Sequence, residues 1–265
     1  MAMLSTACAV GSSDVPQGPE ESSSGETGGR AGRGDELFSA EGPRGPVEPA
    51  PSNAPFTCRQ GAFCDDFEKT APASGWTRLE ASGGALSFEP PSASSGLKSL
   101  RATTTDAASS AYLVHEGEQL GGSWSGAFGS ALRLGAMPTT VMAASRVVVV
   151  RADGVASVGI VIVPEGIRVE QHDSHCAASS CRERSDLIAL GDASGAFHRF
   201  TLGFEVQATT TYPYGRVELS IDGEVGYVPL DVPLARGNVE IHLGVTRADD
   251  APIDASFDDA LFFVR

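Results

Sequence analysis

Residues 217–223 read Val-Glu-Leu-Ser-Ile-Asp-Gly, and this stretch decides the fold. Val217, Leu219 and Ile221 alternate with polar residues, as side chains do along a β-strand that has one face buried and one face in water. The Asp222-Gly223 pair that follows is a strong signal for a tight turn between antiparallel strands. The stretch therefore predicts a β-hairpin.

The same alternation recurs on both sides of this hairpin. Residues 200–206 and 239–245 alternate apolar and polar side chains, whereas residues 146–150 and 158–163 are denser in valine and isoleucine, as inner strands are. No window of helical length shows a 3.6-residue period. About a dozen such short strands predict an all-β domain over residues 56–265, built as an antiparallel two-sheet β-sandwich.

The order of several segments along the chain resembles a known family. Phe197-His198-Arg199-Phe200-Thr201-Leu202 leads into the hairpin, much as an aromatic-His-x-aromatic-x-Leu strand precedes a strand ending in Asp-Gly in concanavalin A-like (laminin-G-like) jelly rolls. The domain opens with Phe63–Glu68 and closes with Phe257–Val264, and Gly96–Arg101 resembles an early strand of such modules. The resemblance implies a jelly roll whose first and last strands lie side by side. Many members of that superfamily bind carbohydrate and some cleave it.

Residues 1–55 differ from the domain in composition. Gly, Pro and Ser fill 23 of the 47 positions in residues 9–55, which predicts a disordered linker. The preceding Ser5-Thr6-Ala7-Cys8 resembles the lipobox of bacterial lipoproteins, although that pattern places Leu three residues before the Cys and here Leu4 lies four before it. We interpret residues 1–8 as the remnant of a lipoprotein signal with Cys8 as the lipidation site. A cysteine placed there by chance is the alternative.

The five cysteines support this interpretation. Two local disulfides, Cys58 with Cys64 and Cys176 with Cys181, would use four of them and leave Cys8 for the lipid, although four cysteines allow three pairings. Disulfides need an oxidising compartment, so we expect export to the cell envelope or beyond.

The charge balance excludes one class of partner. With 34 acidic and 19 basic residues, the formal net charge is −15, which repels phosphate backbones and argues against nucleic-acid binding. No run of about 18 apolar residues is present to cross a bilayer as a helix. We therefore expect membrane attachment through the N-terminal lipid only.

The sequence offers little for catalysis. Glucanases of the resembling superfamily carry Glu-x-Asp-x-x-Glu on one strand, and no such string occurs here. Alginate lyases of the same type carry Gln-x-His, whereas Gln171-His172 lacks the spacer. We therefore expect no enzyme. The cluster His172-Asp173-Ser174-His175-Cys176 names metal ligands and a nucleophile together, but neighbouring residues on an extended strand point to opposite faces. A polar loop held by a disulfide is favoured over a zinc site.

Acidic pairs near the two ends of the domain suggest a cation. If the terminal strands are neighbours, Asp65-Asp66 and Asp258-Asp259 approach each other, and a structural calcium with Asp66 and Asp259 among its ligands would offset their repulsion. The alternative is that these are turn residues whose carboxylates accept backbone hydrogen bonds.

Carbohydrate recognition requires exposed aromatic rings beside polar groups. Trp124, placed among glycines in an expected surface loop, and Tyr112, Tyr212 and Tyr214 are the candidates, whereas we expect Trp76 in the core. The sequence thus predicts an exported, lipid-anchored protein whose jelly roll binds carbohydrate or another extracellular polymer. One alternative is a structural envelope protein without a small ligand, which smooth sheet faces would favour. The other is a polysaccharide hydrolase or lyase, for which two carboxylates or an Arg–His–Tyr set must converge on one sheet.

Overall fold

The computed structural model describes residue 58 and residues 60–69, 74–89, 94–175, 183–184, 188–189, 194–211, 214–249 and 252–265. The expectations for the linker over residues 9–55 and for Cys8, Cys176, Cys181 and Tyr212 lie outside these described residues. Within the described part of the chain, no helix could span a membrane.

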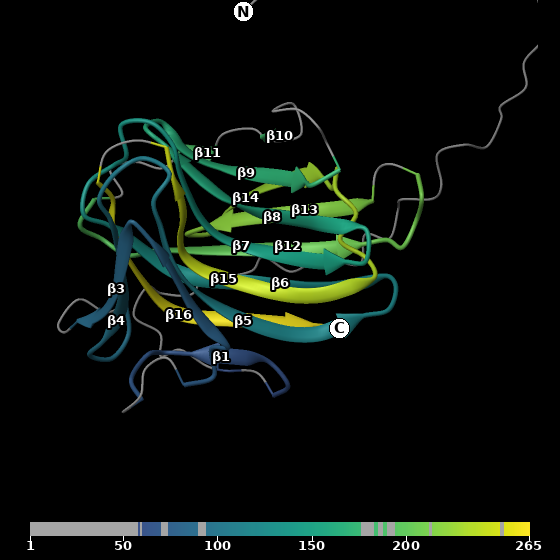
Figure 1. The fold of residues 1–265 in the computed structure, drawn as a ribbon, viewed down its shortest axis with the longest axis horizontal. Helices are drawn as coiled ribbons and strands as arrows, with labels where there is room; N and C mark the ends of the chain where they lie inside the picture. The colour runs from purple at the N-terminus through teal and green to yellow at the C-terminus, as the bar shows by residue number, and fades with distance from the viewer. Residues whose placement is uncertain are drawn as a thin grey trace, which may run out of the picture. The chain divides into compact units, whose positions relative to one another are not determined.

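Two antiparallel sheets stack face to face (Figure 1), which confirms the predicted sandwich. The first sheet has the order β14-β13-β12-β6-β16-β4-β3, with β1 also on β16. Its strands are β1 (Phe63–Asp65), β3 (Gly84–Glu89), β4 (Ser99–Thr104), β6 (Trp124–Leu134), β12 (His198–Val206), β13 (Gly215–Ile221), β14 (Glu224–Pro229) and β16 (Asp254–Val264).

The second sheet has the order β10-β9-β8-β7-β15-β5-β2, with β11 also on β9. Its strands are β2 (Arg78–Ser82), β5 (Ser110–Leu120), β7 (Met142–Arg151), β8 (Gly154–Val163), β9 (Gly166–Asp173), β10 (Glu183–Arg184), β11 (Ile188–Ala189) and β15 (Gly237–Ala248).

The predicted hairpin joins β13 to β14. Val217, Leu219 and Ile221 are buried, and their polar neighbours face away from the core, as the alternation predicts. Asp222 and Gly223 form the turn with φ of 48° and 93°, and two positive φ values suit the right-handed twist of the flanking strands.

The first and last strands are neighbours, as the resemblance implies. Phe63 pairs with Phe262 and Asp65 with Ala260. A register shift in β16 between Asp258 and Leu261 separates its pairing with β4 from its pairing with β1, and Asp259 adopts a φ of 51° there. The bulge therefore sets the direction of the buried aspartates at this edge.

Side chains from the facing sides of both sheets form the core. Phe128 and Phe257 from the first sheet and Leu113, Ile160 and Leu243 from the second are fully buried. Near the start of the domain, Cys58 and Cys64 form the expected disulfide, which closes a loop of adjacent sequence ahead of β2.

Candidate functional site

The outer face of the second sheet, the side turned away from the first sheet, carries a row of aligned residues, four of which are charged or polar. Strand pairing aligns one residue from each of six strands along this row. The flanking positions Val147, Val158 and Ile241 are fully buried in the core, so the row itself faces outward. The aligned residues are Arg78 of β2, Val114 of β5, His242 of β15, Arg146 of β7, Gly159 of β8 and Glu170 of β9.

Arginine, histidine and tyrosine converge at the centre of this row. Nε of Arg146 donates a hydrogen bond of 3.2 Å to Nδ1 of His242. The rings of Tyr112 and His242 stack with centroids 4.9 Å apart and an angle of 14° between their planes. The guanidinium carbon of Arg146 lies 6.0 Å from the Tyr112 ring centroid. Three side chains from three adjacent strands thus hold one another in place.

His242 is a neutral link in this network. Burial lowers the pKa of His242 to about 4, and the charge of Arg146 acts in the same direction, whereas Glu240 opposes the shift. The other ring nitrogen, Nε2, donates to a carboxylate oxygen of Glu240 at 2.9 Å. The neutral ring therefore carries its proton on Nε2 and accepts from Arg146 on Nδ1.

Glutamates surround the other end of the row. Arg78 donates to Glu240 at 3.0 Å, to Glu80 at 3.0 Å and to Glu116, which lies directly opposite Glu240 on the neighbouring strand. Burial raises the pKa of Glu240, but hydrogen bonds from His242 and Arg78 outweigh it and hold this pKa below its usual value. Glu240 is therefore an ionised acceptor and a poor proton donor.

A hollow of about 210 Å³ opens beside Arg146 on the same face. Across it, Arg247 donates two hydrogen bonds of 3.2 Å to the carboxylate of Glu170. Gly159 leaves the space that Arg146 fills, because a Cβ atom there would fall 2.6 Å from Cβ of Arg146. The polar side chains that line the hollow are Arg146, Ser157, Glu170, His172, Thr246 and Arg247.

The outer face of the first sheet has a hollow of about 270 Å³. There Arg216 pairs with Glu205 at 2.8 Å and lies over the ring of Tyr227 at 5.0 Å. The side chains of this pair are 42% and 60% exposed, and solvent weakens such ion pairs. The second sheet therefore offers the more desolvated set of charges, and we treat its outer face as the candidate site.

Comparisons with known proteins identify the fold. No protein-family model matches the sequence, and no curated protein matches it. Among solved structures, the cellulose-induced protein Cip1 superposes with a TM-score of 0.51 at 14% identity, covering 77% of this chain and 96% of that one. The carbohydrate recognition domain of Emp47p superposes with a TM-score of 0.50 at 12% identity, covering 77% and 94%. The domain has a jelly-roll fold.

An enzyme shares this jelly roll. The GlcNAcα1-4Gal-releasing endo-β-galactosidase from Clostridium perfringens superposes with a TM-score of 0.52 at 11% identity. The match covers 78% of this chain and 64% of the enzyme, so the chain spans less than two thirds of that protein. At such identities the comparisons establish the fold of the jelly roll and leave its function to the site.

The aromatic residues predicted to bind carbohydrate lie in different surroundings in the structure. Tyr112 lies in the site. Trp124 is 6% exposed, and its Nε1 donates to the carbonyl of Leu234 at 3.0 Å. The expected surface-loop position of Trp124 is wrong, because it begins β6 and its ring turns inward onto Phe204. Tyr214 is half-buried against the core, and Trp76 is buried, as expected.

Hydrogen bonds satisfy the carboxylates at the β1–β16 edge of the jelly roll. Asp66 accepts from the backbone of Glu68 at 3.2 Å, and Asp259 pairs with Arg199 at 2.6 Å. Burial raises the pKa of Asp258 to about 7, although three backbone N–H groups donate to it. Among the described residues, no three His, Cys, Asp or Glu side chains gather as metal ligands. The calcium site with Asp66 and Asp259 stays a prediction.

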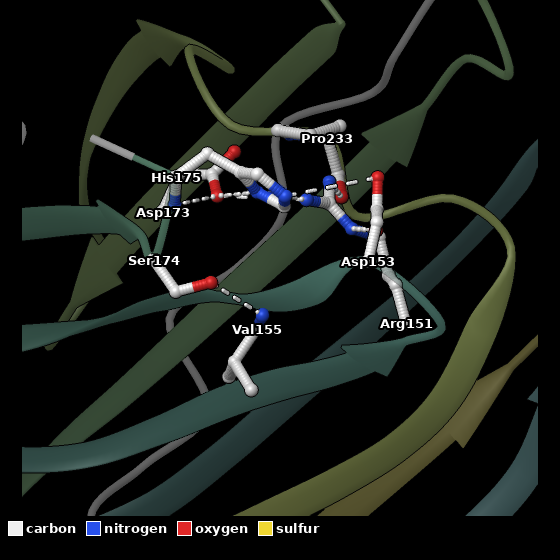
Figure 2. Close-up of polar contacts among 7 residues, drawn as sticks. All are labelled: Arg151, Asp153, Val155, Asp173, Ser174, His175 and Pro233. Carbon is white, nitrogen blue, oxygen red and sulfur yellow. Dashed lines mark hydrogen bonds and ion pairs between the residues drawn. The ribbon is translucent and has the colours of Figure 1, made fainter. Parts of the chain in front are cut away.

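The cluster at residues 172–175 divides between two surroundings. His172 lines the hollow, whereas Asp173, Ser174 and His175 close the end of the β7–β8 hairpin (Figure 2). The Ser174 hydroxyl accepts from the backbone of Val155 at 2.8 Å, and Asp173 accepts from the backbone of His175 at 3.0 Å. Among the described residues, the Ser174 hydroxyl therefore hydrogen-bonds to the backbone and not to His172 or His175, so the hydrogen bonds of a nucleophile triad are not formed.

Sequence reasoning named Tyr112 but missed the charged residues around it. Glu240 and His242 were visible as the polar members of the alternation over residues 239–245. Arg78 and Arg146 gave no such signal, because only strand register aligns β2 and β7 with β15.

Proposed function

We propose that this protein binds a carbohydrate polymer on the outer face of its second sheet. The convergence of Tyr112, His242 and Arg146 beside a hollow carries this proposal. A fixed aromatic ring packs against the apolar side of a sugar, and charged side chains around it accept and donate hydrogen bonds to the hydroxyl groups. The jelly rolls to which this domain is similar include a carbohydrate recognition domain, which supports the same class of ligand.

The hollow suits one unit of a longer ligand. Its volume of about 210 Å³ lies below the ~300–1,000 Å³ of sites that enclose drug-sized molecules. A polymer laid across the sheet would place one sugar in the hollow and neighbouring sugars over Tyr112 and the glutamates around Arg78.

Affinity gel electrophoresis of the full chain tests the proposal. We expect a polysaccharide in the gel to retard the protein, and Tyr112→Ala to lower the affinity at least tenfold. Tyr227→Ala is the matched control, because Tyr227 is 51% exposed on the opposite sheet. If Tyr227→Ala abolished binding and Tyr112→Ala did not, the site would lie on the first sheet. A panel without any retardation would favour the structural envelope protein. Runs with calcium and with chelator test whether binding needs the metal.

Cleavage of the bound polymer is a second candidate function. Glu116 and Glu240 face each other across two strands, and the Arg–His–Tyr set that an enzyme would need is assembled. Binding alone is favoured, because two donors hold the pKa of Glu240 below its usual value and make this residue a poor general acid. Incubation with each retarding polymer, followed by size-exclusion chromatography, decides this point. Shortened chains that disappear in Glu240→Gln would establish an enzyme.

We also propose export and lipid anchoring through Cys8. The disulfide between Cys58 and Cys64 supports an oxidising compartment. In a bacterial host, radioactive palmitate should label the full chain and not the Cys8→Ser variant. Equal labelling of both would overturn the anchor.

A further inference from the structure

Arg146 carries a positive charge that forms no ion pair with any of the described residues. A guanidinium stays protonated and has five N–H donors. One donor bonds to His242, which is neutral, and Tyr112 also hydrogen-bonds to the guanidinium, which leaves the remaining donors available. In the part of the chain that the structure describes, no carboxylate lies within ion-pair distance of Arg146.

The surroundings of Arg146 make this charge costly. The side chain is half-buried and lies against the ring of Tyr112 and the backbone at Gly159. Burial lowers the pKa of Arg146, and Tyr112 and Glu170 only partly oppose the shift. A partly desolvated cation gains more from an anionic partner than an exposed one does.

The nearby carboxylates, Glu170 and Glu240, form ion pairs with other arginines. Glu170 accepts both of its hydrogen bonds from Arg247, which also pairs with Asp249 at 2.6 Å. Glu240 accepts from Arg78 and His242. The edge of the hollow at Arg146 is therefore positive, and Ser157 and His172 lie on the same hollow.

The net charge of the chain is opposite in sign to the local charge at Arg146. At −15, the protein repels polyanions at long range. A polyanion that binds must therefore do so through short-range contacts at a local positive site. Binding of a polyanion to this protein would therefore not arise from non-specific electrostatic attraction.

We propose that the hollow receives the carboxylate or sulfate group of an acidic sugar, paired with Arg146, and that the bound polymer is an anionic polysaccharide. This inference rests on the proposed carbohydrate site and adds the chemical class of its ligand. Charge-assisted hydrogen bonds from the free guanidinium donors hold the anion, and Tyr112 packs against the adjoining ring.

Charge-matched polymers test the inference on the full chain. The first pair is polygalacturonate and its methyl ester, and the second is dextran sulfate and dextran. We expect one acidic member to retard the protein with at least tenfold higher affinity than its neutral counterpart, and the pair that responds tells carboxylate from sulfate. Arg146→Gln should lower this affinity at least tenfold, Arg146→Lys should restore part of it, and Arg216→Gln on the opposite sheet should leave it unchanged.

The possible failures are distinguishable. Equal retardation by both members of each pair, or by neutral polymers alone, would overturn the anionic ligand while leaving the carbohydrate site in place. No retardation by any polymer would overturn both. If Arg146→Gln fails to fold, the comparison of matched polymers with the unmodified protein still decides the question.

Discussion

Nε of Arg146 and Nδ1 of His242 lie 3.2 Å apart, although 96 positions separate the two residues in the chain. The pair forms because β7 and β15 are adjacent in the second sheet and these residues stand opposite each other in register. A permanent cation beside a buried imidazole disfavours protonation of the ring. The consequences of this arrangement can be measured.

The first prediction concerns the pKa of His242. Burial is the largest cause of its depression to about 4, and the charge of Arg146 is the second. Arg146→Gln should raise this pKa toward, but not to, the ordinary value of 6.5. NMR titration of the histidine ring measures it, with Arg216→Gln as a control of equal charge change on the other sheet. An unchanged pKa of His242 in Arg146→Gln would contradict the predicted effect of the Arg146 charge on the ring.

The second prediction concerns stability between pH 4.5 and 7. The folded-state pKa of His242 is depressed, so its contribution to the unfolding free energy is lost as the pH falls below 6.5 toward 4. The folded-state pKa of Asp258 is raised to about 7, so its contribution is present at low pH and is lost as the pH rises toward 7. The shifts correspond to on the order of 3 and 4 kcal/mol, with opposite signs.

Urea denaturation at several pH values separates these two contributions. The wild-type profile should be nearly flat in this window. His242→Gln should become more stable as the pH falls from 7 to 4.5, and Asp258→Asn should become less stable. Slopes of the same sign in both variants would show that one of the two assignments is wrong.

The third prediction concerns the glycine beneath Arg146. In Gly159→Ala the new Cβ would meet Cβ of Arg146 at 2.6 Å and the carbonyl oxygen of Ser145 at 2.9 Å. We expect a loss of about 1–3 kcal/mol in stability from the overpacking and a weaker hold on the polymer. Gly203→Ala on the opposite sheet is the control, because its nearest neighbour would lie at an ordinary 3.5 Å. Equal melting temperatures for the two variants would refute the tight fit.

The fourth prediction concerns the ion pairs that Arg151 forms with Asp153 and Asp173 at the end of the β7–β8 hairpin. Arg151 donates to the carbonyl of Pro233 at 3.0 Å, and its side chain is only 9% exposed (Figure 2). Its two acidic partners differ, since Asp173 is 16% exposed and Asp153 is 69% exposed. Burial raises the pKa of Asp173, but hydrogen bonds from His175 and the charge of Arg151 outweigh it and lower this pKa.

Asparagine at each position compares the two partners. Asp173→Asn should lower the unfolding free energy by about 1–3 kcal/mol, because a buried arginine loses a charged acceptor. Asp153→Asn should cost less than about 1 kcal/mol, because solvent screens an exposed pair. Thermal melts at pH 7 measure both. A larger loss of unfolding free energy in Asp153→Asn than in Asp173→Asn would show that the exposed carboxylate is the more important partner of Arg151.

The predictable part of this protein follows from local patterns. Alternation with a period of two located β13 and β15 and marked which of their side chains are buried, and Asp222-Gly223 located the turn between β13 and β14. The disulfide between Cys58 and Cys64 joins residues only six positions apart. Trp124 was misplaced because its glycine neighbours suggested a loop, whereas pairing with β12 fixes it in a strand with its ring inward.

The sequence by itself determined several of the strands, the sandwich class and the negative charge, because each of these depends on neighbouring residues or on composition. Only the tertiary structure decided the site. Arg78, Tyr112, Arg146 and His242 come from four strands scattered over the chain, and their meeting depends on strand order and register. A shift of one residue in any of these pairings would turn the side chain toward the other face of the sheet.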